Sequence, residues 1–207
     1  MTAEVNSQDV YAAPEAEITS EHEATAEFFT IHMTKFYVMT IGTMGIYFLY
    51  WFWKHWKVIK LANGLNIWPI PRTIFSLFYT HSLFSRFKAG ADSYGDKHIG
   101  WSSASIATIF IVAGLLGWAS NAFPEDNLFF AVASMALAIV ITIVQAIVGA
   151  KAQKVANYAA GDEDGENNTS YSVGNIVWLV IGGLLWLITI ASVVILALFG
   201  TAFGSAF

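Results

Sequence analysis

One short segment of this sequence carries the residue types that a metal site needs. Asp92, Asp96 and His98 lie close together in the stretch ADSYGDKH. Carboxylate oxygens and an imidazole nitrogen are ligands that divalent cations accept. A D-x-x-x-D-x-H spacing has little specificity, however, and Gly90 and Gly95 give the segment the character of a turn. We therefore interpret it as a polar connector and expect neither a bound metal nor a cofactor.

Two further polar side chains stand in apolar surroundings. His81 is near Tyr79 and Arg86, where it could titrate close to neutral pH or contact a lipid headgroup. An aromatic side chain with a polar tip at a membrane interface explains it more simply. Gln145 is the most polar residue deep in an apolar run, where it could line a pathway or hydrogen-bond between helices. We favour the hydrogen bond and keep both residues as candidate polar contacts.

Motifs of known catalytic chemistry are missing from the sequence. It contains no Gly-rich phosphate loop, no HExxH pair and no supported Ser/His/Asp arrangement. It also has no cysteine, which excludes disulfides, thiolate metal sites and cysteine nucleophiles. We expect no catalytic residue and a protein that is not an enzyme. A membrane enzyme using His81 or the Asp92–His98 segment is the weakest hypothesis.

The composition indicates a membrane protein. Hydrophobic residues make up 56% of the chain and charged residues only 12%, whereas soluble domains carry about 25% charged residues. The long apolar runs are Phe36–Trp53, Ser103–Phe123, Leu128–Ala150 and Val173–Gly200. A helix needs about 20 apolar residues to cross a bilayer. The expected fold is therefore all-α, a helical integral membrane protein with about four transmembrane helices.

The first of these runs has two interpretations. Phe36–Trp53 is free of charge over 18 residues, which is just long enough for one spanning helix. Trp and Tyr residues crowd its second half and lysines follow at once, so we expect the helix to end at the cytoplasmic interface. The alternative is a re-entrant hairpin that reverses at Gly42 and Gly45. In that case the N-terminal side of the run would stay inside.

The segment Arg72–Lys88 predicts an amphipathic helix. Arg72, Tyr79 and Arg86 recur at seven-residue spacing along one stripe. The opposite side carries large apolar residues, namely Ile74, Leu77, Phe78 and Phe84. Such a helix commonly lies in the plane of the membrane interface. We favour this in-plane arrangement over a tilted spanning helix, which would have to place His81 and both arginines near the bilayer core.

The basic residues orient the chain. Nine of the ten Lys and Arg residues lie in the two stretches Lys54–Lys97 and Lys151–Ser172. Cytoplasmic loops are enriched in Lys and Arg, so both stretches are expected inside and the turn Pro124–Asn127 outside. If Phe36–Trp53 spans, both termini are outside as well. The three later apolar runs contain no ionisable residue, which argues against an ion-coupled pump.

Three regions follow from these patterns. Residues 1–28 form an acidic tail that we expect to be disordered, because it has too few bulky apolar residues to offset its ordering entropy. Residues 29–101 hold the first apolar run and the amphipathic helix. Residues 102–207 form a three-helix transmembrane region with an acidic loop at 161–170.

A group of aromatic and basic residues, here termed the collar, is the best candidate for a working surface. Its members are Tyr47, Tyr50, Trp51, Trp53, Lys54, Trp56, Lys57, Arg72 and Arg86. Because the collar adjoins apolar runs, anionic lipid headgroups are a better match for it than nucleic acid, at roughly 1 kcal/mol per Lys or Arg near the surface. We expect a non-enzymatic accessory or scaffold protein that contacts anionic lipid or a membrane-protein partner at the cytoplasmic face. The alternative is a small channel or transporter acting as a homo-oligomer.

The N-terminal third also resembles a family of small multi-pass bacterial membrane proteins without an assigned activity. That family has a Phe-Phe lead, a Lys, a T-x-G-[IL]-Y-x-x-Y-W-F-x-K-x-W block and a later Arg-x-[Ile/Leu]-Phe…Leu-Phe segment. The matching residues here are Phe28, Phe29, Lys35, Thr43, Gly45, Ile46, Tyr47, Tyr50, Trp51, Phe52, Lys54, Trp56, Arg72, Ile74, Phe75, Leu83 and Phe84. The chain departs from the pattern at Met44, where an aromatic is common, and in having both Pro69 and Pro71 before the Arg. The resemblance implies a helical membrane architecture and the bacterial inner membrane, and it transfers no mechanism.

Overall fold

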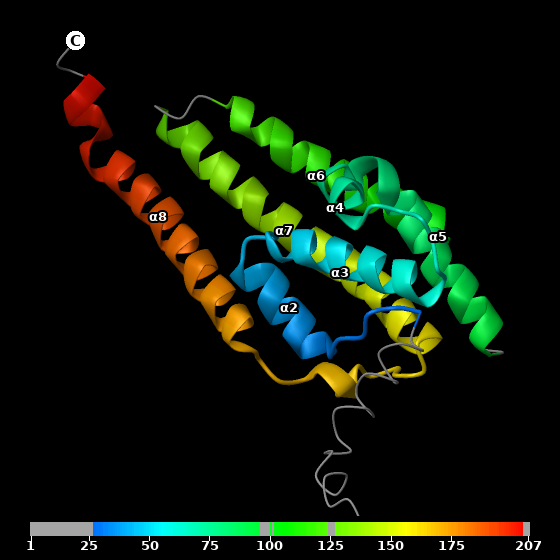
Figure 1. Cartoon of the computed structure of the whole chain (residues 1–207). Coiled ribbons are helices and arrows are strands. Elements are labelled where there is room, and N and C mark those ends of the chain that lie inside the picture. Colours follow the sequence, from blue (N-terminus) through cyan, green and yellow to red (C-terminus); the bar gives the residue numbers. More distant parts are fainter. Residues whose placement is uncertain (1–26, 96–99, 101, 124–126, 205–207) are drawn as a thin grey trace, which may run out of the picture.

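The fold is all-α, as predicted. The computed structural model describes residues 27–95, 100, 102–123 and 127–204, and this part of the chain contains no strand (Figure 1). The α-helices are α2 (Met33–Gly42), α3 (Tyr47–Ala62), α4 (Pro69–Ile74), α5 (Ser76–Tyr94), α6 (Ser103–Ala119), α7 (Leu128–Ala159) and α8 (Val173–Gly204). Two 3-10 turns, η1 (Ser120–Ala122) and η2 (Glu166–Asn168), lie in the connections. Most of the expected acidic tail, residues 1–26, lies outside the described residues.

Helix α7 organises the bundle. It packs against α2, α5, α6 and α8, so helices from the N-terminal and C-terminal regions share it as a common partner. Its C-terminal part contributes buried small residues, among them Ala150, Ala152 and Ala156. Small side chains allow neighbouring helices to approach closely. The deepest packing therefore surrounds the C-terminal half of α7.

Among the described residues, two helices are long and apolar enough to cross a membrane. They are α7 and, within α8, Val173–Phe199; α6 is similarly apolar but has only 17 residues. Large apolar side chains on α8 are mostly exposed, with Leu187 at 64% and Leu198 at 66%. A soluble protein would bury such a face, so the exposure favours a lipid environment. At a rise of 1.5 Å per residue each 32-residue helix is about 48 Å long, longer than the roughly 30 Å hydrocarbon core.

The first apolar run is not one helix, so the expectation of one continuous helix over Phe36–Trp53 is wrong. α2 ends at Gly42 and α3 begins at Tyr47. Met44 (φ 53°) and Gly45 (φ 83°) both lie in the left-handed region, which reverses the chain. Thr43 Oγ1 donates to Met39 O and accepts from the backbone N–H of Tyr47, which joins the two helices. The local structure is that of the helical-hairpin alternative, and the two helices diverge from the turn (Figure 1).

The amphipathic segment is also divided. α4 begins at Pro69 and ends at Ile74, and α5 begins after Phe75. The residues of the predicted apolar face differ in environment: Phe84 is buried, while Ile74, Leu77 and Phe78 are exposed. Ile74 belongs to α4, whereas Leu77, Phe78 and Phe84 belong to α5, whose buried residues are Thr80, Leu83, Phe84, Phe87 and Ala91. α5 packs alongside α6 and α7 through Leu83, Phe84 and Phe87.

The core is largely aromatic. Trp51 is fully buried and meets Phe36 at 6.0 Å, Phe84 at 6.1 Å and Phe87 at 6.0 Å between ring centroids, all close to edge-on. Phe110 of α6 packs against Phe48, Phe52 and Phe84. Edge-to-face pairs contribute about 0.5–1.5 kcal/mol each beyond burial. These contacts fix α3 against α2, α5 and α6.

Helix α8 joins the bundle at the hairpin turn. A Cβ on Gly182 would lie 2.2 Å from Gly42 O and 2.5 Å from Thr43 Cα, so only glycine permits this approach. One turn later Trp186 Nε1 donates to Ile41 O at 2.9 Å. That carbonyl is near the C-terminus of α2, where it also accepts from the backbone N–H of Met44 at 3.1 Å. Helix α8 therefore contacts the end of α2 through Gly182 and Trp186, and its preceding turns lie along the hairpin.

Candidate functional site

The collar cations rest on aromatic rings. Lys57 Nζ lies 5.2 Å from the centre of the Trp53 ring, and Lys54 Nζ lies 5.6 Å from that of Phe29. The Arg72 guanidinium lies 4.5 Å from the Trp56 ring and 5.0 Å from a second ring, Tyr79. Cation–π contacts of this kind are worth about 0.5–1 kcal/mol at exposed sites. They hold three positive charges at defined places beside α3.

The predicted collar residues divide into core and surface. Trp51 and Trp56 are completely buried, so they build the core and cannot touch a ligand. Tyr50 and Lys57 are exposed, and Trp53, Lys54 and Arg72 are half-buried. Arg86 is half-buried on α5. The surface part of the collar is thus smaller than the sequence alone predicted.

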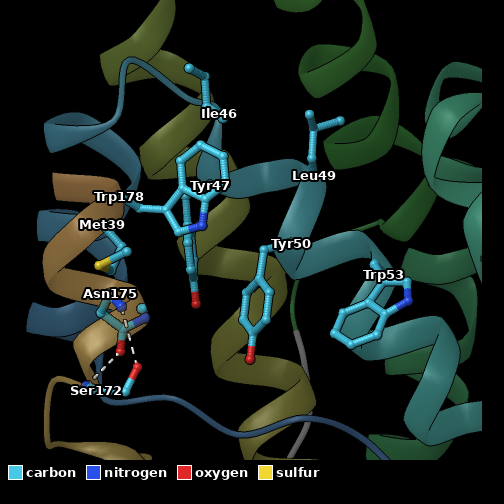
Figure 2. A pocket seen from close by; sticks show the side chains of 10 residues that line it. Met39, Ile46, Tyr47, Leu49, Tyr50, Trp53, Ser172, Asn175 and Trp178 are labelled. Carbon is cyan, nitrogen blue, oxygen red and sulfur yellow. Dashed lines mark hydrogen bonds between the residues drawn. The ribbon is translucent and has the colours of Figure 1, made fainter. Parts of the chain in front are cut away.

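A groove separates the α2–α3 hairpin from the start of α8. Three collar residues line it, Tyr47, Tyr50 and Trp53, and its volume is about 390 Å³. The remaining wall residues are Met39, Ile46, Leu49, Ser172, Gly174, Asn175 and Trp178. Figure 2 shows these side chains around the open space. Sequence patterns could not indicate that the start of α8 completes this wall, because the two segments are more than a hundred residues apart.

The groove is polar at one end and apolar at the other. In Figure 2 the Tyr47 and Tyr50 hydroxyls point toward the end where Ser172 and Asn175 lie, and Ile46 and Leu49 stand at the opposite end. Ser172 and Asn175 each accept a hydrogen bond from the other's backbone N–H, at 3.2 and 3.1 Å, which caps α8. The polar end is therefore built from ordered groups.

A buried polar network lies behind the groove, and sequence reasoning missed it. Gln153 of α7 is fully buried; its Oε1 accepts from Trp51 Nε1 and from His55 Nε2, the latter at 3.0 Å. Its Nε2 donates to Phe29 O at 2.9 Å and to Asn157 Oδ1 at 2.7 Å. Trp Nε1 can only donate and a carbonyl can only accept, so both ends of the amide are assigned.

Asn157 extends this network to the segment that precedes α2. It accepts from Ile31 N at 3.2 Å and donates to Ile31 O at 3.0 Å, so it pairs with both backbone groups of that residue. A second amide, Asn168 of the turn η2, holds the same segment. Its Nδ2 donates to Thr30 O at 2.9 Å, and its Oδ1 accepts from Lys35 Nζ at 2.5 Å. The only signal in the sequence was an i, i+4 pair of amides, Gln153 and Asn157, on one face of α7.

His55 is held neutral in this network. Complete burial lowers its pKa to about 3, and the hydrogen bond with Gln153 opposes that shift only in part. Because Nε2 donates to Gln153, Nδ1 carries no proton, and it has no hydrogen-bond partner among the described residues. His55 is thus a structural histidine, which contacts the buried collar residue Trp51 at 4.8 Å between ring centroids and shares Gln153 Oε1 with it.

The other polar candidates lie apart from the groove. His81 is exposed on α5. Gln145 is half-buried, donates to Phe110 O at 3.4 Å, and borders a second hollow of about 240 Å³ with Ser76 and Thr80. Asp92 pairs with Lys88 at 2.9 Å on the surface of α5, an ordinary i, i+4 ion pair. Asp96 and His98 lie outside the described residues.

Comparison of the chain with protein-family models, with curated proteins and with solved structures finds no match to any of them. The family resemblance seen in the N-terminal third therefore stays a prediction.

Proposed function

We propose that this chain is a multi-pass protein of the bacterial inner membrane, a non-enzymatic accessory or scaffold protein whose collar contacts anionic lipid or a partner membrane complex at the cytoplasmic face. The observation that supports it best is the set of cations fixed on aromatic rings, Lys57 on Trp53 and Lys54 on Phe29, beside an aromatic groove. Such a surface suits anionic headgroups, which attract Lys and Arg by roughly 1 kcal/mol each.

The proposed topology has three spanning helices and one re-entrant hairpin. α6, α7 and α8 cross the membrane, and α2–α3 enters from the cytoplasmic side and turns at Thr43–Ile46. This arrangement keeps Lys54, Lys57 and Lys151 on one side. It also places the start of α2 in the cytoplasm, so no acidic N-terminal segment has to be translocated. Satisfied backbone groups at the turn, such as those bonded by Thr43, are what a re-entrant loop needs.

The test is gentle extraction from a membrane containing anionic and zwitterionic lipid, followed by identification of the co-purified lipids and proteins. Lys54 and Lys57 are changed together to Glu, which places two negative charges on the collar. The matched control changes Lys151 and Lys154 to Glu, because this pair has the same i, i+3 spacing and is exposed on α7. We expect the collar variant to lose its excess of anionic lipid or its partner, and the control to retain it. If both variants behave alike, the proposal that the collar binds anionic lipid or a partner is refuted.

One observation favours the alternative of a small oligomeric channel or transporter. The second hollow brings Ser76, Thr80 and Gln145 together between α5, α6 and α7. Aligned polar side chains at membrane depth can line a path when several copies assemble. This function predicts flux across vesicles containing the protein that responds to Gln145→Leu, and silent vesicles would exclude it.

A further inference from the structure

We propose that the groove between the α2–α3 hairpin and α8 is a discrete binding site for one anionic phospholipid of the surrounding bilayer. The acyl portion would lie against Ile46 and Leu49, and the headgroup would face Lys57 beyond Trp53. This inference rests on the proposed function for the membrane location and for the side on which the collar lies. It goes further in naming a single molecule, its orientation and the residues that enclose it.

The polarity of the groove matches an amphipathic ligand. Its apolar end is formed by residues that flank the hairpin turn, and its polar end by two tyrosine hydroxyls together with Ser172 and Asn175 (Figure 2). The proposed topology puts the turn within the bilayer and the start of α8 at the cytoplasmic interface. The polarity of the groove and that of the inner leaflet therefore change in the same direction. A lipid of that leaflet would enter the groove in its normal orientation, with its headgroup toward the cytoplasm.

The charges beside the groove determine the sign of the headgroup. Lys57 lies over the ring of Trp53, which lines the groove. Lys54, one helical turn earlier on α3, lies over the ring of Phe29. A third cation, Lys35, bonds to Asn168 Oδ1 and Ser170 O and lies 5.8 Å from the Tyr171 ring, next to the polar end. Within the part of the chain that the structure describes, no Asp or Glu lines the groove. An anionic headgroup is the complementary partner.

The shape of the groove fits a lipid better than a partner helix. Its volume of about 390 Å³ falls in the range of sites for small ligands, about 300–1,000 Å³. A helix with its side chains is about 10–12 Å across and rises 5.4 Å per turn, so a groove of this volume would hold no more than about one turn of it. Tyr47, Tyr50, Trp53 and Trp178 give the groove aromatic walls, which suit flexible hydrocarbon.

Gly174 offers a way to fill the groove without disturbing the fold. It lines the groove, and a Cβ there would meet only Ser172 Oγ at 3.7 Å, an ordinary contact distance. Gly174→Leu would therefore project a side chain into the open space. Gly183→Leu is the matched control, because it makes the same change on the same helix at a position where nothing lies within 4 Å and which does not line the groove.

The experiment is native mass spectrometry of the full chain released from nanodiscs of mixed phosphatidylglycerol and phosphatidylcholine. We expect one retained lipid per chain, with phosphatidylglycerol favoured, in the wild type and in Gly183→Leu. In Gly174→Leu the retained fraction should fall by at least about tenfold, as overpacking of this size costs. Equal retention in both glycine variants would overturn the groove as the site, provided that both remain folded by circular dichroism.

The Lys54/Lys57→Glu variant separates this inference from the proposed function. If it keeps one lipid per chain but loses the preference for phosphatidylglycerol, the groove and the collar both stand. If the preference is unchanged while Gly174→Leu still loses the lipid, the collar fails and the groove stands as a lipid site. If the collar variant alone alters lipid recovery and Gly174→Leu does not, the proposed function stands and the groove fails.

Discussion

Gln153 should be the most costly single polar residue to remove from this protein. Replacing it by Leu keeps the approximate volume but deletes four hydrogen bonds at a fully buried position. Asn157 retains its two bonds to Ile31, so its loss is small. Three groups are left without a partner, namely Trp51 Nε1–H, His55 Nε2–H and Phe29 C=O.

The magnitude follows from those three groups. An unsatisfied buried donor or acceptor costs about 1–3 kcal/mol, which gives about 3–6 kcal/mol for the set once partial relaxation is allowed. That is a large share of a typical unfolding free energy of about 5–15 kcal/mol. For a chain of this length it corresponds to a fall in Tm of about 6–24 °C.

Gln145→Leu is the matched control for this prediction. It makes the same substitution on the same helix two turns earlier, at a half-buried residue with one long bond of 3.4 Å to Phe110 O. Interhelical bonds of this kind are worth about 0.6 kcal/mol in a membrane protein, so its Tm should change by only a few degrees. Thermal unfolding in detergent, followed by tryptophan fluorescence, measures both variants. If Gln153→Leu unfolds within a few degrees of Gln145→Leu, the network does not stabilise the fold as argued.

Two further predictions concern α8 and pH. Gly182→Ala should detach α8 from the hairpin, because its Cβ would lie 2.2 Å from Gly42 O. Gly183→Ala is the control, since a Cβ there has open space around it. Protease cleavage in the 161–172 loop measures both variants, and equal cleavage would contradict the role of the Gly182 contact. His55 should make stability fall in mild acid, because its pKa is about 3 when folded and 6.5 otherwise, so the unfolded chain takes up the proton first. The contribution of neutral His55 to the unfolding free energy is complete above pH 6.5 and decreases as the pH falls toward the folded pKa. At pH 5.5 it is smaller by about 1.4 kcal/mol. Unfolding at pH 7.5 and 5.5 measures it, His55→Asn should flatten the difference, and a wild-type stability that rises in acid would refute the assignment.

The helical class and the long later helices could be predicted from the sequence, and the hairpin could not be decided. Hydropathy measures the length of an apolar run, and Phe36–Trp53 satisfies that measure whether or not it is continuous. The decision depends on two successive residues at positive φ, Met44 and Gly45. Glycine adopts that conformation readily, whereas methionine rarely does, so the residue type at position 44 does not indicate a turn. Only the contacts of the folded turn, including α8 packed on Gly42, compensate the strain at Met44.

The buried network was unpredictable for a different reason. Gln153 and Asn157 follow Lys151 and precede an acidic loop, so their neighbours in sequence indicate a solvated helix end. Their burial comes from Phe28, Phe29 and Ile31, an extended segment more than a hundred residues earlier that lies across the end of α7. Local polarity therefore gave the wrong environment, because a non-local segment supplies the cover.

The structure also separates the parts of the N-terminal motif that build the fold from those that face outward. Thr43 joins α2 to α3, Gly45 permits the turn, and Trp51 bonds to Gln153 within the core. Substituting any of these would damage the fold, so loss of function at such positions would say little about a ligand. The informative members of the motif are Tyr50 and Lys54, together with their neighbours Trp53 and Lys57 outside it, because they lie at the surface or line the groove. A binding defect confined to those four side chains, in protein that unfolds normally, is therefore the result that would distinguish a working surface from a folding requirement.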